Sequence, residues 1–322
     1  MPPAERTATS TGRPASCPAC DGELRFWRWV GASEPDLAAR RFGLWRCEAC
    51  GTAVTVGALP PRLHETGAYR PAAPRLYRLA HPFLHSFDRQ RLAFVRALIP
   101  PPARLLDAGA GRGRFVLAAQ AAGYEASGIE PSVRGSSAAA GLGAAVLPAS
   151  IEAAPIEPGS VDAVTLWHVL EHLDHPGDAL TAIGSWLRPA GGLVVGVPNL
   201  ASLQARLGGA RWYHLDVPRH RVHFTVAGLH ALLERSGFEV VATHHLILEH
   251  NPFGMWQSWI SRITRHPSYL YNLIKRNAPV RSLDLGLTVA LLPLAPVAAV
   301  LELAAAAAGR GGTVAVLARW RR

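Results

Sequence analysis

The sequence has little charge and a single lysine. Of its 322 residues, 17% are charged and 49% are hydrophobic, which excludes a disordered chain; the length suggests about two domains. Lys275 is the one lysine, so the net charge of +10 rests almost wholly on arginine. This charge permits association with nucleic acid or an anionic membrane surface, but it does not discriminate between folds.

The first 16 residues lack the apolar run of a secretory signal. We therefore expect a flexible leader over 1–16 and a chain that works in the cytoplasm. No internal repeat is visible, and Ala304 to Ala308 is the one low-complexity run.

Cysteine is scarce and occurs as two C-x-x-C pairs separated by 26 residues. This grouping suits a metal site better than a disulfide framework, and it favours a closed tetrahedral site without an open coordination position for catalysis. With strand-like stretches at 24–30 and 42–46, it predicts a structural zinc ribbon over 17–56. Four unligated cysteines or a rubredoxin-like iron site remain as alternatives. The predicted metal ligands are Cys17, Cys20, Cys47 and Cys50.

Residues 57–84 are rich in proline and arginine and predict a linker before a helix at 87–99. Short apolar runs then alternate with helical stretches, which predicts an α/β fold with a doubly wound, mainly parallel sheet. The expected strands are 104–107, 126–130, 145–148, 161–167, 193–197, 239–243 and 313–318, and the expected helices are one from 114, then 136–142, 178–187 and 225–236.

A glycine-rich turn follows the first expected strand of this sheet, in the segment LLDAGAGRG at 105–113. Glycines let a ligand approach the backbone, and the helix that follows offers unpaired N–H groups. Glu130 ends the next strand, where a carboxylate can accept both hydroxyls of a ribose. A nicotinamide-dinucleotide fingerprint needs glycine or alanine where Arg114 stands, so the turn disfavours that cofactor.

This turn resembles motif I of the class I S-adenosylmethionine-dependent methyltransferases. Further segments at 149–162, 167–173, 187–199 and 212–237 are similar to that family in order, over roughly 85–250 and 311–320. The last segment is similar to bacterial relatives of the ubiquinone-biosynthesis O-methyltransferases, several of which carry an N-terminal zinc ribbon. The resemblance implies a seven-stranded, Rossmann-like sheet with an antiparallel last strand, and a methyltransferase domain over 85–250 and 311–322.

The resemblance also assigns a site for S-adenosylmethionine. The glycine turn would cradle the cofactor, Glu130 would hold the ribose, Ile151 and Glu152 would flank the adenine, and the segment after the fourth strand would line the methionine end. One departure is Ser150, where the family usually has an acidic residue. The implied cofactor-binding residues are Asp107, Gly109, Ala110, Gly111, Gly113, Glu130, Ile151, Glu152, Trp167, His168 and His172.

Histidines gather after the fourth and fifth strands of the sheet, where doubly wound sheets bind ligands. A hydroxyl acceptor profits from a positioned base, and histidine titrates near neutral pH. His220 and His223 are the first candidates to face the acceptor, with His168 and Tyr213 after them; a structural role stays open for each. His168 and His172 have a spacing that metal sites use, but no set of carboxylates accompanies it, so we expect no catalytic metal.

Residues 251–310 form an apolar insertion before the last strand. Aromatic and basic side chains alternate over 255–277, and an uncharged run of 17 residues at 285–301 is broken by Pro293 and Pro296. A single membrane crossing would prevent 313–318 from returning to the sheet. The segment 255–308 therefore predicts a cap on the domain or on a second subunit of a homodimer, or a shallow membrane-surface hairpin.

Together these features predict methyl transfer to a small-molecule, lipid-like or glycan acceptor, at oxygen. A ribosomal RNA methyltransferase is the first alternative, because some such enzymes pair this fold with a zinc ribbon. Enzymes that methylate nucleic-acid bases often carry an Asn or Asp followed by two prolines and an aromatic residue after the fourth strand, and this signature is absent here. No aromatic stacking platform lies outside the insertion either, so nucleic acid is not the expected partner. An inactive scaffold is the second alternative.

Overall fold

The computed structural model describes the chain except residues 1–14, 34–36, 38, 58–76 and 276–277. Most of the expected leader and most of the expected linker lie outside the described residues. Helix α1 spans Tyr77–Leu98, so the prediction that the linker runs to 84 and the first helix starts at 87 was wrong.

Seven strands form one sheet in the order β10-β11-β8-β7-β4-β5-β6. Strands β4, β5, β6, β7 and β8 are mutually parallel, whereas β11 is antiparallel to both of its neighbours. The predicted Rossmann-like fold of the class I methyltransferases is thereby confirmed. The strands are β4 Arg104–Ala108, β5 Glu125–Ile129, β6 Val146–Leu147, β7 Val161–Trp167, β8 Leu187–Pro198, β10 Phe238–His244 and β11 Thr313–Trp320.

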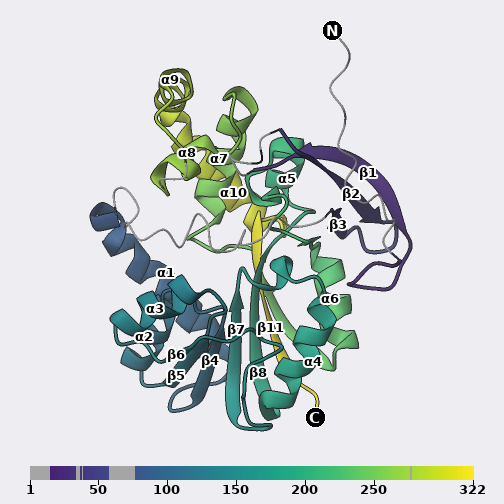
Figure 1. Ribbon diagram of the computed structural model, residues 1–322, viewed down its shortest axis with the longest axis vertical. Coiled ribbons are helices and arrows are strands. Elements are labelled where there is room, and N and C mark those ends of the chain that lie inside the picture. Colours follow the sequence, from purple (N-terminus) through teal and green to yellow (C-terminus); the bar gives the residue numbers. More distant parts are fainter. Residues whose placement is uncertain (1–14, 34–36, 38, 58–76, 276–277) are drawn as a thin grey trace.

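Helices cover both faces of this sheet (Figure 1). On one face lie α1, α2 (Arg114–Ala121) and α3 (Val133–Gly141), and on the other lie α4 (Pro176–Trp186) and α6 (Val226–Arg235). Apolar side chains at helical spacing, such as Leu229 and Leu233 of α6, are fully buried against the strands. Each such side chain contributes about 1.5–3 kcal/mol, so the two cores fix the strand ends that carry the site.

The cysteine-containing segment forms an antiparallel sheet in the order β1-β2-β3-β9. Strands β1 (Leu24–Gly31), β2 (Arg41–Cys47) and β3 (Ala53–Val56) come from the N-terminal segment, but β9 (Val222–His223) comes from the methyltransferase part. Thr225 Oγ1 also donates a hydrogen bond to the Cys50 carbonyl at 2.6 Å. The ribbon is therefore joined to the loop that carries the candidate histidines.

The insertion is helical, as predicted, and lies with the ribbon beyond the carboxyl ends of the parallel strands (Figure 1). Buried Glu302 accepts hydrogen bonds from Asn251 Nδ2 at 2.9 Å and Gly312 N at 2.6 Å, which ties α10 to the start of β11. The helices of the insertion are α7 Asn251–Ile263, α8 Tyr269–Ile274, α9 Ser282–Ala290, the short 3-10 helix η7 Leu292–Leu294 and α10 Ala295–Ala307. Earlier in the chain come the 3-10 helix η4 Leu170–His172, helix α5 Leu203–Gly208 and the 3-10 helices η5 Gly209–Arg211 and η6 Tyr213–Leu215.

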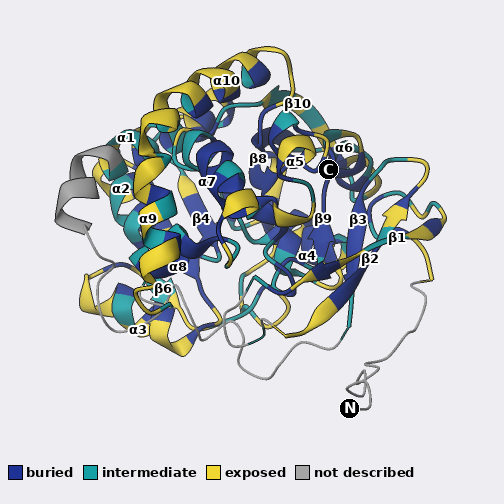
Figure 2. Ribbon diagram, turned by 90° about the horizontal axis from the view of Figure 1, so that it is seen from above, coloured by how far each residue is buried: buried dark blue, intermediate teal, exposed yellow. Residues whose placement is uncertain are grey.

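Within the described residues no single helix is long and apolar enough to cross a membrane. The pair Ser282–Ala290 and Leu292–Ala307, bent by 42°, meets the length and composition requirement only when taken together. Figure 2 shows many exposed residues along α9 and α10.

Candidate functional site

The glycine turn between β4 and α2 depends on backbone conformations that favour glycine. Gly109, Gly111 and Gly113 have φ angles of 81°, 56° and 75°. A Cβ atom at Gly109 would overlap Val169, which follows β7, and one at Gly113 would overlap Ala144. The turn thus lies tightly between neighbouring loops, in the arrangement that lets a ligand approach backbone N–H groups.

Glu130 is buried at the end of β5 and faces this turn. Its Oε2 accepts a hydrogen bond from Gly111 N at 2.9 Å, and its Oε1 accepts one from Ser132 N at 2.8 Å. Asp107 lies at the strand end below the turn and accepts a 2.6 Å hydrogen bond from Thr165 Oγ1. Burial raises the pKa of Asp107 to about 6. Both predicted acids therefore lie beside the turn.

The predicted adenine residues lie on the turn after β6, where Ile151 is buried and Glu152 is exposed. Trp167 ends β7 with its ring packed edge-on against Phe115 of α2, at 6.1 Å between centroids. The Arg91 guanidinium of α1 stands 4.9 Å over the Trp167 ring and pairs with Glu249 at 2.6 Å. These contacts hold α1 along the edge of the candidate cofactor site.

His168 comes directly after β7 and has a φ of 56°, which is unusual for a residue other than glycine. Its Nδ1 lies 2.9 Å from Glu171 Oε1, and its ring is 4.1 Å from that of His250 and 6.1 Å from that of His214. In the described part of the chain, the Nε2 atoms of all three histidines are buried without a hydrogen-bond partner. Burial lowers the pKa of His214 and His250 well below the ordinary range, so both are neutral at pH 7.

His220 and His172 also lie beside Glu171. His220 Nδ1 lies 2.8 Å from the His214 carbonyl and its Nε2 lies 4.0 Å from Glu171 Oε1, while His172 Nδ1 lies 3.1 Å from the Arg219 carbonyl. Burial alone would raise the pKa of Glu171, but the hydrogen bond from His168 and the surrounding imidazoles outweigh it and lower the pKa to about 2. Glu171 is thus an ionised carboxylate enclosed by histidines.

The other two acceptor candidates, His223 and Tyr213, contact groups other than Glu171. His223 Nε2 lies 2.8 Å from Thr55 Oγ1 inside the ribbon sheet; since that hydroxyl donates to the His220 carbonyl, the imidazole is the donor to the hydroxyl. Burial lowers the pKa of His223 to about 3. Tyr213 packs edge-on against Phe253 and Tyr271 of the insertion, at 5.5 and 5.4 Å between ring centroids.

Three residues of this cluster were not assigned a role by the sequence. Glu171 lies within the segment 167–173 that resembles the family, but its position in the sequence did not indicate that His220 would lie close to it. His214 and His250 come from segments far along the chain. The predicted position of ligand sites at the carboxyl ends of parallel strands was the one signal that pointed to this cluster.

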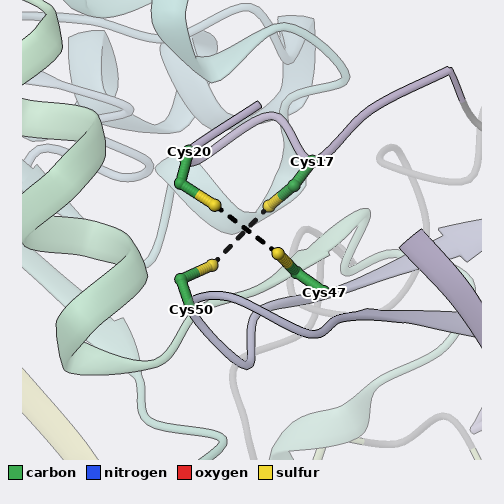
Figure 3. Close-up of side chains that lie close together, drawn as sticks. All are labelled: Cys17, Cys20, Cys47 and Cys50. Atoms are coloured by element: carbon green, nitrogen blue, oxygen red, sulfur yellow. Dashed lines mark hydrogen bonds between the residues drawn. The ribbon is translucent and has the colours of Figure 1, made fainter. Parts of the chain in front are cut away.

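The four cysteines converge from two turns, and Figure 3 shows their Sγ atoms directed at one point. Cys17 Sγ lies 3.7 Å from Cys50 Sγ, and Cys20 Sγ lies 3.5 Å from Cys47 Sγ. A zinc ion bound tetrahedrally at about 2.3 Å from each sulfur places the sulfurs about 3.8 Å apart. A hydrogen bond from Cys17 lowers the pKa of Cys50 to about 4, so a thiolate is present at neutral pH. The residues therefore fit a Cys₄ metal site.

Comparison with known proteins identifies the family. A family model described as a methyltransferase domain matches residues 80–243, just over half of the chain. The protein therefore belongs to this methyltransferase family, and it is an enzyme that uses S-adenosylmethionine as methyl donor. No curated protein matches the sequence significantly.

Three solved structures are similar over most of their length. The [4+2]-cyclase SpnF has 19% identity and a TM-score of 0.49, covering 78% of this chain and 97% of its own. A Thermotoga maritima methyltransferase described as a possible histamine N-methyltransferase has 21% identity and a TM-score of 0.45, covering 76% and 96%. The Burkholderia thailandensis 1,6-didemethyltoxoflavin-N1-methyltransferase, solved with bound 1,6-didemethyltoxoflavin and S-adenosylhomocysteine, has 18% identity and a TM-score of 0.42, covering 84% and 96%.

Proposed function

We propose that this methyltransferase transfers the methyl group of S-adenosylmethionine to a hydroxyl oxygen of a small-molecule or lipid-like acceptor. The observation that carries the proposal is His168, a half-buried imidazole whose Nε2 atom is buried without a hydrogen-bond partner. Its unusual backbone conformation costs roughly 1–3 kcal/mol, a cost that is common at functional positions.

The residues around the glycine turn fit the cofactor. Gly109 and Gly113 let the turn pass close to Val169 and Ala144 without a side chain in the way, and Glu130 directs a buried carboxylate at the turn. Together with Asp107 they would hold S-adenosylmethionine, with Ile151 and Glu152 at the adenine and Trp167 and His172 toward the methionine end. The cofactor supplies a methyl group already activated on a sulfonium, so the chain has to orient the acceptor and exclude water.

His168 would then take the proton of the acceptor hydroxyl. Glu171 Oε1 can only accept a hydrogen bond, so it fixes the hydrogen on Nδ1 of His168 and leaves the lone pair on Nε2. A carboxylate that orients an imidazole in this way recurs in enzymes that use histidine as a general base. His220 is the second candidate, whereas His223 is occupied by Thr55 in the ribbon sheet and fits a structural role better.

The insertion favours an apolar or lipid-linked acceptor. Residues 282–309 contain two charged side chains, Asp284 and Glu302, and both are buried, so the exposed surface of this segment is uncharged. We propose that this apolar face, which includes exposed Val289, Val297 and Val300, rests on the cytoplasmic surface of a membrane. A dimer through the same face is the competing arrangement.

We also propose that the cysteines bind a structural zinc ion. Four sulfur ligands leave no open position on the metal, and the ribbon they fix contributes β3, to which β9 and the His220 loop are attached. Zinc would thus support the acceptor side of the site without taking part in the reaction.

The oxygen-transfer proposal is tested by methyl transfer from radiolabelled S-adenosylmethionine into lipid extracts, small hydroxyl compounds and ribosomal RNA. We expect label in an ether linkage, and His168→Asn to abolish turnover while cofactor affinity stays within a few-fold. Label in RNA would support the RNA alternative, and label on nitrogen or carbon would overturn the oxygen proposal. A cofactor-binding protein that labels nothing in any extract would support the scaffold.

The membrane proposal is tested by flotation with anionic phospholipid vesicles. Wild type is expected to float, and Val300→Glu to remain in solution. Val133→Glu is the matched control, because Val133 is 68% and Val300 63% exposed, and Val133 lies on α3 away from this face. A wild type that does not float but sediments as a dimer, with Val300→Glu monomeric, would replace the membrane by a second subunit.

A further inference from the structure

The donor atoms of Glu171, His172 and His220 meet at one point on the acceptor side of the site, all within 4.8 Å of one another. Glu171 and His172 belong to η4, immediately after β7, and His220 comes from the loop before β9. The backbone N–H of Arg221 donates a 2.7 Å hydrogen bond to the Glu171 carbonyl, which holds the two segments together.

Both imidazoles are held in the tautomer that metal ligation requires. A carbonyl oxygen can only accept a hydrogen bond, so the His214 carbonyl fixes the hydrogen of His220 on Nδ1, and the Arg219 carbonyl does the same for His172. In each ring the lone pair is therefore on Nε2, and Nε2 of His220 lies 4.0 Å from Glu171 Oε1. Metal-ligating histidines are commonly oriented by such an outer hydrogen bond.

One carboxylate oxygen of Glu171 is available to bind a cation. Glu171 is 1% exposed; its Oε1 serves His168, and its Oε2 is buried without a hydrogen-bond partner. Among the described residues its ion pairs are with histidines alone. A carboxylate buried without a full positive charge is costly, and a cation bound at Oε2 removes that cost.

We propose that Glu171, His172 and His220 bind a divalent first-row transition-metal ion, which in turn binds the acceptor hydroxyl. Two imidazoles and a carboxylate suit such ions, and three protein ligands leave coordination positions open, unlike the Cys₄ site. Metal–ligand distances of about 2.0–2.2 Å require these side chains to close in by about 1 Å.

The metal-site proposal rests on the proposed function. It also explains why the nucleophile is a hydroxyl oxygen. Coordination lowers the pKa of the acceptor hydroxyl and places its oxygen beside His168, whose Nε2 takes the proton. The new bond joins this oxygen to the methyl carbon as the methyl–sulfur bond breaks, and the bonding electrons stay on sulfur, which becomes a neutral thioether. The metal ion keeps its charge and oxidation state throughout.

The test is a titration of Co²⁺ into protein whose Cys₄ site is loaded with zinc, followed by visible absorption and by metal analysis of the dialysed protein. We expect one Co²⁺ per chain, with weak bands lacking the intense sulfur-to-cobalt absorption of a thiolate site. Glu171→Gln and, separately, the half-buried His172→Ala should weaken binding by more than the roughly 10–100-fold that loss of an outer-shell partner costs. His230→Gln, which removes a half-buried histidine bonded to Thr243, is the matched control and should bind as wild type does.

The possible failures are distinguishable. Wild type that binds no second metal ion, or Co²⁺ binding that survives in folded Glu171→Gln and His172→Ala, overturns the metal site. S-adenosylmethionine titrated into the same preparations tests the proposed function by itself. Cofactor binding without Co²⁺ binding leaves the methyl-transfer proposal standing, with His168 as the base, and Co²⁺ binding without cofactor binding leaves the metal site and removes the reaction.

Discussion

Replacing Gly113 by alanine should destabilise the protein through two separable effects. Gly113 precedes α2 with a φ of 75°, and a non-glycine residue in this left-handed region costs about 1–2 kcal/mol. A methyl group there would also lie well inside 3.0 Å of the Ala144 Cβ and 3.1 Å from the Ala139 Cβ, both buried. Overpacking of this kind costs about 1–3 kcal/mol, so we expect a total loss of about 2–5 kcal/mol.

The matched control is Gly143→Ala. Gly143 has nearly the same φ, 78°, but a Cβ there would meet nothing within 4 Å, so it should cost only the backbone strain of about 1–2 kcal/mol. Free energies of unfolding from urea titrations, followed by circular dichroism, give the difference between the two variants.

A double variant isolates the overlap. Ala144→Gly removes the methyl group that Gly113→Ala would strike, so the loss in the double variant should be smaller than the sum of the two single losses, by about 1 kcal/mol or more. Equal costs for Gly113→Ala and Gly143→Ala, or simple additivity in the double variant, would refute the packing argument. Either result would show that the glycine is needed only for its backbone conformation.

Further predictions concern the ribbon and Asp107. Cys47→Ala should release the zinc and lower the melting temperature, as metal analysis and calorimetry would show, whereas neighbouring exposed Glu48→Ala should keep the ion. Unchanged zinc content in Cys47→Ala would contradict the Cys₄ site. Because burial raises the pKa of Asp107 from an ordinary value of 3.8 to about 6, its charged form destabilises the fold by about 3 kcal/mol at neutral pH. The stability that protonated Asp107 contributes is therefore fully present below pH 4 and is lost as pH rises through 6. The free energy of unfolding of Asp107→Asn should accordingly increase relative to that of wild type between pH 4 and 7. Parallel stability curves for the two proteins in urea over that range would contradict the shift.

The sequence predicts the sheet, the glycine turn and the position of Glu130 beside it well, because all three depend on local pattern. The strand–turn–helix segment at Asp107 to Gly113 and the strand ending at Glu130 are contiguous, and parallel strands bring their carboxyl ends to one edge. The two-residue strand β9 has no periodicity to detect, and its partner Ala53 lies 170 residues away from His223. Its pairing with the ribbon could not be predicted from local signals.

The acceptor side is less predictable for the same reason. Glu171 and His220 approach each other only when η4 and the loop before β9 are folded together. The expectation of no catalytic metal rested on the absence of carboxylates at a suitable sequence spacing, which carries no information about such a long-range approach. The two charged residues within 282–309 are a second feature whose location the sequence did not indicate. Asp284 and Glu302 are buried and bonded inside the protein, where Glu302 Oε1 accepts a hydrogen bond from Gly312 N at 2.6 Å. Burial of these two residues leaves the exposed surface more apolar than the sequence suggests.

The most direct test of the central claim is calorimetric titration of S-adenosylmethionine and S-adenosylhomocysteine into wild type, Glu130→Gln and Glu130→Ala. We expect a wild-type Kd on the order of micromolar. Hydrogen bonds to a charged group contribute about 1.5–3 kcal/mol, so both variants should bind about 10–100-fold more weakly, while exposed Glu239→Ala at the far end of the sheet should bind as wild type does. A folded wild-type protein that binds neither compound, or Glu130 variants with unchanged affinity, would contradict the assignment of this turn as the cofactor site.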